Sequence, residues 1–214
     1  VEVNYLQDWL SEAPAEDNKQ AKWRMDVAQS GGGAIGDIGT HAHNLACFVL
    51  RLRATSLSAT LSSHVAGRMV DDDARITLQF DGGARGQIWA SQVAIGNENN
   101  LNLAVYGTKG SLRWSQENPN IIIFTELGRA PQTITRGGGM ANAAAAALTR
   151  IPAGHPEGYL EAFATLYKEA AMAIRSPDKV NDATINIEDG FDGVKFVNAC
   201  QNSSQNGASW VDLR

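Results

Sequence analysis

The chain has 214 residues, of which 43% are hydrophobic and 19% charged, and its formal net charge is −5. This composition is typical of a globular protein with a hydrophobic core, and the acidic balance without a basic stripe disfavours nucleic-acid binding. Two cysteines, Cys47 and Cys200, exclude a disulfide framework and a zinc site built from cysteines. They predict reduced thiols in a cytoplasmic protein. No apolar run is long enough for a membrane span, so no membrane association is expected.

The first quarter of the sequence predicts a strand, a loop and a long helix. Residues 1–10 are apolar and indicate an extended strand, whereas polar residues 11–20 include Pro14 and predict a loop. From Ala34 to Leu52 apolar residues recur at three- and four-residue spacings, which indicates the buried face of a helix. These residues are Ile35, Ile38, Ala42, Leu45, Val49 and Leu52.

The centre of the sequence predicts a series of short strands. Apolar and polar residues often alternate there, with a clear period of two at Ile76, Leu78 and Phe80. Turn signals at Asp81-Gly82-Gly83 and at Gly107–Gly110 separate the strands and predict antiparallel hairpins. The predicted strands are Thr55–Val65, Arg75–Phe80, Ala84–Val93, Leu101–Tyr106, Ser111–Trp114 and Ile121–Thr125.

The last third predicts a loop over residues 136–156 with one helical turn, then two helices and a short strand near residues 210–213. Pro156 opens the first helix and Ser176-Pro177 ends it. Its core face would be Tyr159, Leu160, Phe163, Leu166, Tyr167, Ala170 and Ile174. The second helix spans Glu188–Ser203, with Phe191, Val194 and Val197 facing inward. The strands cluster between the helices, so we predict an α+β fold: an open, mostly antiparallel sheet covered on one face by helices.

The glycine-rich segment Gly31–Gly36 matches the pattern G-x-G-x-x-G, but its context argues against a dinucleotide site. That fingerprint needs an apolar strand directly before it and an acidic residue about 20 residues later. Residues 24–30 are polar, and no such acidic residue follows. We therefore interpret the glycines as a flexible entry to the next helix.

Asp37 and His41 form the strongest candidate for a chemical site. In a helix they are one turn apart on one side, and Asn44 joins them one turn later. An imidazole with a carboxylate nearby can work as a general acid–base unit, because the imidazole exchanges the proton and the carboxylate stabilises it. The alternative is structural: Asp37 caps the helix and His41 makes an ordinary polar contact.

Other polar residues could line a ligand site. His155 lies at the start of a predicted helix, where it could face a ligand or cap the helix, and Trp23 with Arg24 precedes the glycine run and could line a pocket. His41 and His43 also suggest a metal, but on a helix the two rings point in different directions and a third ligand is not nearby.

The segment Gly31–His41 (GGGAIGDIGTH) resembles the G-G-G-x-[LI]-x-D-x-G-x-H-x-x-D motif of the glucose–fructose oxidoreductase / inositol dehydrogenase family (Gfo/Idh/MocA). The segment Val105–Leu112 resembles the family's v-x-G-t-x-G-x-l hairpin. Glu188-Asp189-Gly190, followed by Ala199 and Ser203, resembles its C-terminal helix. The resemblance extends over nearly the whole chain.

The resemblance implies the C-terminal half of a two-domain oxidoreductase. In the family an N-terminal Rossmann domain binds NAD or NADP, and a C-terminal domain with an open sheet, like that of glyceraldehyde-3-phosphate dehydrogenase, binds a sugar or polyol and forms the oligomer. Residues 1–214 resemble only the second domain. We therefore expect a Rossmann domain to be missing from this chain, which starts with Val1 and not with Met, and the chain alone to be inactive.

By the same resemblance, Asp37 and His41 match the catalytic pair. Trp23, Arg24, Asn44 and His155 are the residues we expect at the substrate. The last motif Asp of the family is Asn44 here, and an amide cannot act as a base. A homodimer or homotetramer formed through the sheet is also expected.

Two alternatives from other functional classes remain open at this point. The first is a free-standing sheet protein that assembles or binds a partner, in which Asp37 and His41 are merely structural. The second is a metal-dependent lyase or hydrolase that uses Asp37, His41 and His43.

Overall fold

The structure, a computed structural model, describes residues 1–13, 17–19, 23, 30–177 and 186–214. The chain divides into two compact units. Unit 1 consists of Val1–Val105 and Glu188–Arg214, and unit 2 consists of Tyr106–Ile187. Within the described residues no helix is both long enough and apolar enough to cross a membrane.

Unit 1 contains a sheet in the strand order β5-β1-β4-β3-β2-β9. All neighbouring strands pair antiparallel except β1 and β4, which are parallel. The strands are β1 (Glu2–Leu6), β2 (Ala54–Ser62), β3 (Asp73–Phe80), β4 (Arg85–Ser91), β5 (Asn100–Tyr106) and β9 (Val211–Asp212). A short 3₁₀ turn, η2 (Asp81–Gly83), joins β3 to β4, as the glycine turn signal predicted.

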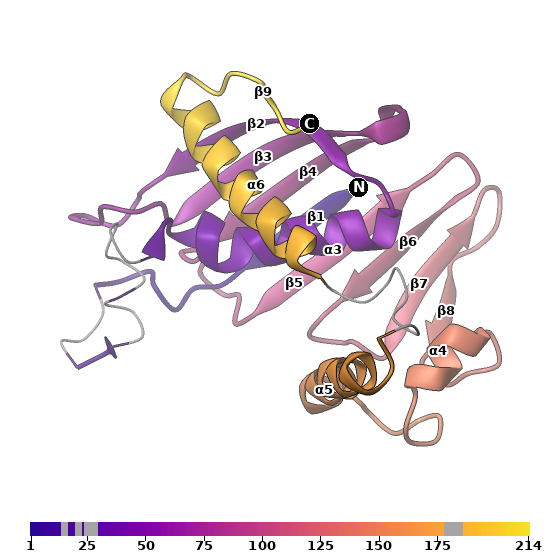
Figure 1. Cartoon of the computed structure of the whole chain (residues 1–214). Helices are drawn as coiled ribbons and strands as arrows, with labels where there is room; N and C mark the ends of the chain where they lie inside the picture. Colours follow the sequence, from indigo (N-terminus) through magenta and orange to yellow (C-terminus); the bar gives the residue numbers. More distant parts are fainter. Residues whose placement is uncertain (14–16, 20–22, 24–29, 178–185) are drawn as a thin grey trace. The chain divides into compact units, whose positions relative to one another are not determined.

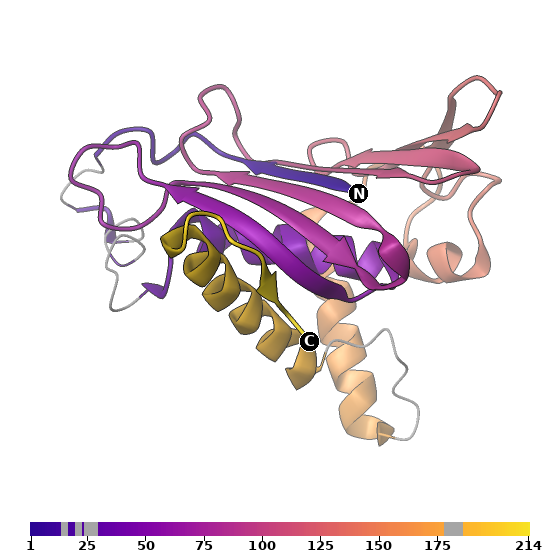
Figure 2. The same cartoon turned by 90° about the horizontal axis from the view of Figure 1, so that it is seen from above.

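Two helices cover one face of this sheet, α3 (Thr40–Leu50) and α6 (Ile187–Gln205) (Figures 1 and 2). Ala74, Ile76, Leu78 and Phe80 of β3 are buried, whereas the residues between them are at least partly exposed. This alternation follows from the pleat of the strand, which turns successive side chains to opposite faces. The prediction of an α+β fold with a mostly antiparallel sheet and helices on one face is therefore confirmed.

The predicted helix over residues 34–52 exists, but its first turn is a π-helix. The π-helix η1 covers Ile35–Gly39, and the N–H of Thr40 bonds to the carbonyl of Ile35, five residues back. The wider turn rotates the helix that follows, so the expected buried stripe is wrong in its second half. Leu45 and Leu52 are only half-buried and Val49 is 38% exposed. Ala42, His43 and Ala46 are buried instead.

The prediction for the last helix was right in place and wrong in orientation. Phe191 and Val194 of α6 are 65% and 60% exposed, and Val197 is half-buried. The buried stripe is Phe196, Ala199, Cys200 and Ser203. Its small side chains bring the helix close to the sheet, where Oγ of Ser203 accepts a hydrogen bond from the N–H of Ala59 (2.8 Å).

Unit 2 contains the antiparallel strands β6 (Gly110–Ser115), β7 (Ile121–Glu126) and β8 (Gln132–Thr135), and the helices α4 (Ala143–Leu148) and α5 (Tyr159–Arg175). The strand β8 was not predicted, because its four residues are mostly polar. The helical turn expected in the following loop is α4. The predicted core face of α5 is wrong, since none of the residues in this helix is buried.

Candidate functional site

The glycine run is held by an acidic residue and not left open for a phosphate. The Asp71 carboxylate accepts hydrogen bonds from the N–H groups of Gly33 (2.8 Å) and Ile35 (2.7 Å). The N–H of Ala34 donates to the Asp71 carbonyl oxygen at 2.9 Å. Gly33 is required there, because a Cβ at this position would lie 1.7 Å from that oxygen. The donors that a pyrophosphate would need at this helix start are thus occupied, which supports the interpretation of the run as a structural entry.

Asp37 lies in the π-helix η1 and is half-buried. Its Oδ2 accepts a hydrogen bond of 2.7 Å from the side-chain amide of Gln92, the residue after β4. Its backbone N–H donates to the carbonyl of Gly33 at 3.0 Å. Single π-turns inside helices occur frequently at functional sites. The π-turn and the Gln92 amide together fix where the Asp37 carboxylate lies.

His41 lies in the first turn of α3, directly after the π-helix, and its side chain is exposed. The Tyr5 ring of β1 approaches it edge to face, with ring centroids 6.2 Å apart and planes at 61°. Tyr5 lies two residues after buried Val3, so both side chains face the helix-covered side of the sheet. An exposed imidazole beside a tyrosine, four residues after a held carboxylate, is available to a ligand.

The two other polar residues of this helix differ in accessibility. Asn44 is exposed, whereas the His43 ring is buried and stacks on Phe196 of α6, with centroids 4.2 Å apart. Its Nε2 lies 3.5 Å from Sγ of Cys47. Burial lowers the pKa of His43 to about 4, although Asp192 opposes this, so the ring is neutral at pH 7. Because the His43 side chain points into the core, it is unavailable to a metal site shared with the exposed His41.

The remaining predicted substrate residues lie elsewhere in the chain. Trp23 is 43% exposed, and Arg24 lies outside the described residues. His155 is exposed on a loop of unit 2, where its Nδ1 is 3.2 Å from the carbonyl oxygen of Pro152. That loop is held by Glu157, whose carboxylate accepts hydrogen bonds from the N–H groups of Arg150 and Ile151.

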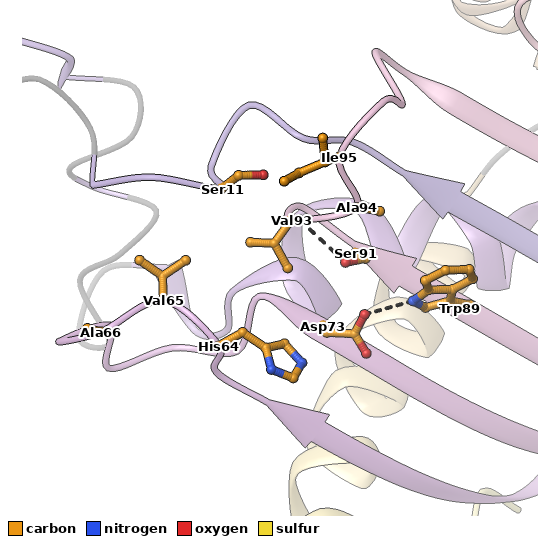
Figure 3. Close-up of a pocket in the computed structure, with 10 residues that line it drawn as sticks. All are labelled: Ser11, His64, Val65, Ala66, Asp73, Trp89, Ser91, Val93, Ala94 and Ile95. Atoms are coloured by element: carbon orange, nitrogen blue, oxygen red, sulfur yellow. Dashed lines mark hydrogen bonds between the residues drawn. The ribbon is translucent and has the colours of Figure 1, made fainter.

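A hollow of about 610 Å³ in unit 1 does not contain the Asp37–His41 pair (Figure 3). Its lining includes Trp89, whose Nε1 donates to Asp73 at 2.7 Å. Asp73 and Trp89 alternate with buried residues that face the helices, so they point to the opposite, open face of the sheet. The lining is Ser11, His64, Val65, Ala66, Asp73, Trp89, Ser91, Val93, Ala94 and Ile95.

Sequence reasoning missed three residues that shape the candidate site: Tyr5, Asp71 and Gln92. The separations are too large for any local pattern, since Gln92 reaches Asp37 across 55 positions and Asp71 reaches Gly33 across 38. The run Asp71-Asp72-Asp73 was the one available signal, because three adjacent acidic residues beside a strand need donors.

A protein-family model described as "GFO/IDH/MocA C-terminal domain" matches residues 1–113, which is more than half of the chain. The chain belongs to the GFO/IDH/MocA family. The matched residues include Asp37 and His41, and the family resemblance of the glycine–aspartate–histidine segment is thereby confirmed.

Relatives of this GFO/IDH/MocA chain are oxidoreductases. The uncharacterized oxidoreductase YfiI of Bacillus subtilis is 26% identical over the whole chain, which covers 57% of YfiI. A Sinorhizobium meliloti oxidoreductase structure is 44% identical with a TM-score of 0.85, over 98% of this chain and 55% of that one.

Two further structures hold ligands. An inositol dehydrogenase homolog from Azotobacter vinelandii, complexed with NADH and myo-inositol, is 33% identical with a TM-score of 0.86, over 99% of this chain and 56% of that one. Levoglucosan dehydrogenase, known from Pseudarthrobacter phenanthrenivorans and solved with NADH and levoglucosan, is 25% identical with a TM-score of 0.83. The alignment covers 99% of this chain and 57% of that one. The chain therefore spans little more than half the length of these proteins.

Proposed function

We propose that this chain is the substrate-binding part of an NAD(P)-dependent oxidoreductase that acts on the CH–OH group of a sugar or polyol. The observation that carries the proposal is the exposed His41, placed after a π-turn that holds Asp37 against a buried amide. The inositol and levoglucosan dehydrogenase structures, with their NADH and polyol or sugar ligands, support the substrate class.

In the proposed reaction His41 is the acid–base group. During oxidation its imidazole nitrogen takes the proton from the substrate hydroxyl while the carbon–oxygen double bond forms. The nicotinamide accepts the hydride released from the same carbon. The edge of Tyr5 limits the orientations of the ring, and Asp37 is our candidate for stabilising the proton that the ring takes up. Asn44, exposed one turn after His41, is our candidate for binding a second substrate hydroxyl.

The glycine run of this chain does not offer a site for the dinucleotide. The helix start after the glycine run is occupied by the Asp71 carboxylate, and a second carboxylate, Asp72, is buried next to it. The Asp71 carboxylate opposes a pyrophosphate there, whereas the charge of Asp72 is paired with Arg68. We propose that a nucleotide-binding domain outside this sequence holds the cofactor. The 214-residue chain alone is then expected to bind NADH weakly, and micromolar affinity in a titration would contradict this.

The test uses the full-length gene product with NAD⁺ and a panel of myo-inositol, levoglucosan and L-sorbose. His41→Ala is expected to lower kcat by about 100-fold, as is usual when an acid–base group is lost. His64→Ala is the matched control, because this histidine is also exposed, lies on a loop after β2 and belongs to neither η1 nor α3. Full turnover in the His41 variant would remove it from the mechanism.

We also propose that copies of the chain associate through the open face of the unit 1 sheet. No described element of unit 1 covers this face, and the Arg75 guanidinium stacks on the Trp89 ring there, 3.7 Å from its centroid. Arg and aromatic side chains are enriched at protein interfaces. Sedimentation of the wild-type protein and of Arg75→Glu tests this, because the charge reversal should weaken a dimer or tetramer and leave a monomer unchanged.

A further inference from the structure

Gln92 is a buried polar residue to which neither the sequence nor the proposed reaction has yet assigned a role. It follows β4 directly and is 2% exposed. Its backbone is held on both sides: its N–H donates to the carbonyl of Asp72 at 2.9 Å, and its carbonyl accepts from the N–H of Leu10 at 3.2 Å. The side chain therefore starts from a fixed backbone position and has little room to move.

The side chain of Gln92 is directed at one atom of the candidate site. Nε2 donates to Oδ2 of Asp37 at 2.7 Å. A carboxylate can only accept hydrogen bonds, so the NH₂ end of the amide must be the one that faces it. A hydrogen bond to the charged form stabilises the carboxylate, and a short bond from a buried donor also restricts its rotation.

We propose that Gln92 is a positioning residue for the reaction: its buried amide holds the carboxylate of Asp37 in one orientation, so that Asp37 can stabilise the proton on His41. This inference rests on the proposed function, because Asp37 and His41 act there as the acid–base pair. Glutamine suits the task because its amide donates without titrating. A lysine would neutralise the carboxylate, and a glutamate would compete with it for protons.

Two substitutions separate positioning from simple packing. Gln92→Leu keeps a side chain of similar size and removes the donor, whereas Gln92→Glu puts a second carboxylate against Asp37. The matched control is Gln132→Glu, the same chemical change at an exposed position of β8 in unit 2. Thermal unfolding of all variants identifies any that fail to fold.

The first readout is the pH profile of the full-length gene product, with NAD⁺ and myo-inositol as the probe. We expect Gln92→Leu to lower kcat roughly 10- to 100-fold, with KM changing much less. An effect of this size is typical when the hydrogen-bond partner of a metal ligand is removed, and Gln92 holds Asp37 in a comparable way. Gln92→Glu should move the acid limb of kcat/KM toward neutral pH, because adjacent carboxylates hold a shared proton. Gln132→Glu should change neither. A folded Gln92→Leu variant with the wild-type kcat and pH profile would overturn the proposal.

The second readout does not depend on catalysis. Crystal structures of the 214-residue chain, as the wild type and as Gln92→Leu, compare the orientation of the Asp37 carboxylate. We expect a single orientation in the wild type and a displaced carboxylate, or more than one orientation, in Gln92→Leu. The same single orientation in both proteins would overturn the positioning role even if His41 proves essential. A displaced carboxylate would support it even if myo-inositol is not turned over.

Discussion

The helices α5 and α6 have similar lengths and opposite relations to the rest of the molecule. In α5 the apolar residues gather on one side, as in a core helix, yet Tyr159, Leu160 and Tyr167 are each about three-quarters exposed. In α6 the large apolar residues Phe191 and Val194 are exposed, while a stripe with several small side chains is buried. Apolar periodicity thus identifies the face that a helix can bury, but it does not show that the chain itself covers that face.

The largest expected effect comes from the one large side chain in the buried stripe of α6. Phe196→Ala should lower the free energy of unfolding by about 3–5 kcal/mol, because it leaves a cavity beside His43. Phe163→Ala on α5 is the matched control and should cost less than about 1 kcal/mol, because Phe163 is already 44% exposed. Urea unfolding followed by circular dichroism measures both. Equal losses would show that the two helices are covered alike.

A second prediction concerns the pH dependence of the α3–α6 interface. Burial lowers the pKa of His43 to about 4, below its usual 6.5. Above pH 6.5 the ring is neutral in both the folded and the unfolded chain. As the pH falls from 6.5 to 4, only the unfolded chain takes up the proton, so the free energy of unfolding should drop by about 3 kcal/mol.

The measurement for His43 is the free energy of unfolding at pH 7 and pH 4, in the wild type and in His43→Phe. The phenylalanine variant cannot titrate at this position, so its loss between the two pH values should be smaller by the His43 contribution. His64→Ala, at an exposed histidine, should lose as much stability as the wild type. If His43→Phe lost as much free energy of unfolding between pH 7 and pH 4 as the wild type, the result would contradict a buried, neutral His43 ring.

The smallest effect is expected on the exposed face of α5. Leu160→Gln should change the free energy of unfolding by less than about 0.5 kcal/mol, because Leu160 is 75% exposed. The same urea series measures it, and Tyr159→Gln on the same face provides a second estimate. A loss of several kcal/mol in either variant would show that this face is buried in the folded chain and would remove the contrast with α6.

Much of the fold could be predicted because its signals are local. The alternation of Ile76, Leu78 and Phe80 predicted β3, and the spacing from Ile35 to Ala42 predicted a helix that begins near the glycine run. The strand β8 escaped prediction because short, polar edge strands carry little alternation. The π-turn escaped because one extra residue in a turn leaves no mark on composition, although it rotated the buried face of α3.

The candidate site likewise consists of residues that the sequence predicted and residues that it did not. The Asp37–His41 spacing is readable within a few residues, because a helix places such positions close together. The amide that holds Asp37 belongs to Gln92, and the donors that Asp71 occupies belong to a segment more than thirty positions away. No rule about neighbours along the chain could pair these residues.

By itself, the sequence determined whether most segments are helices or strands, the fold class, and which residue types make up the glycine–aspartate–histidine segment. Only the tertiary structure decided which helical face is covered, that His43 is buried while His41 is exposed, and that a neutral amide meets Asp37. The physical reason is range: helical and strand periods follow from steric rules within a few residues, whereas burial and hydrogen-bond partners depend on segments that meet only after the sheet has formed.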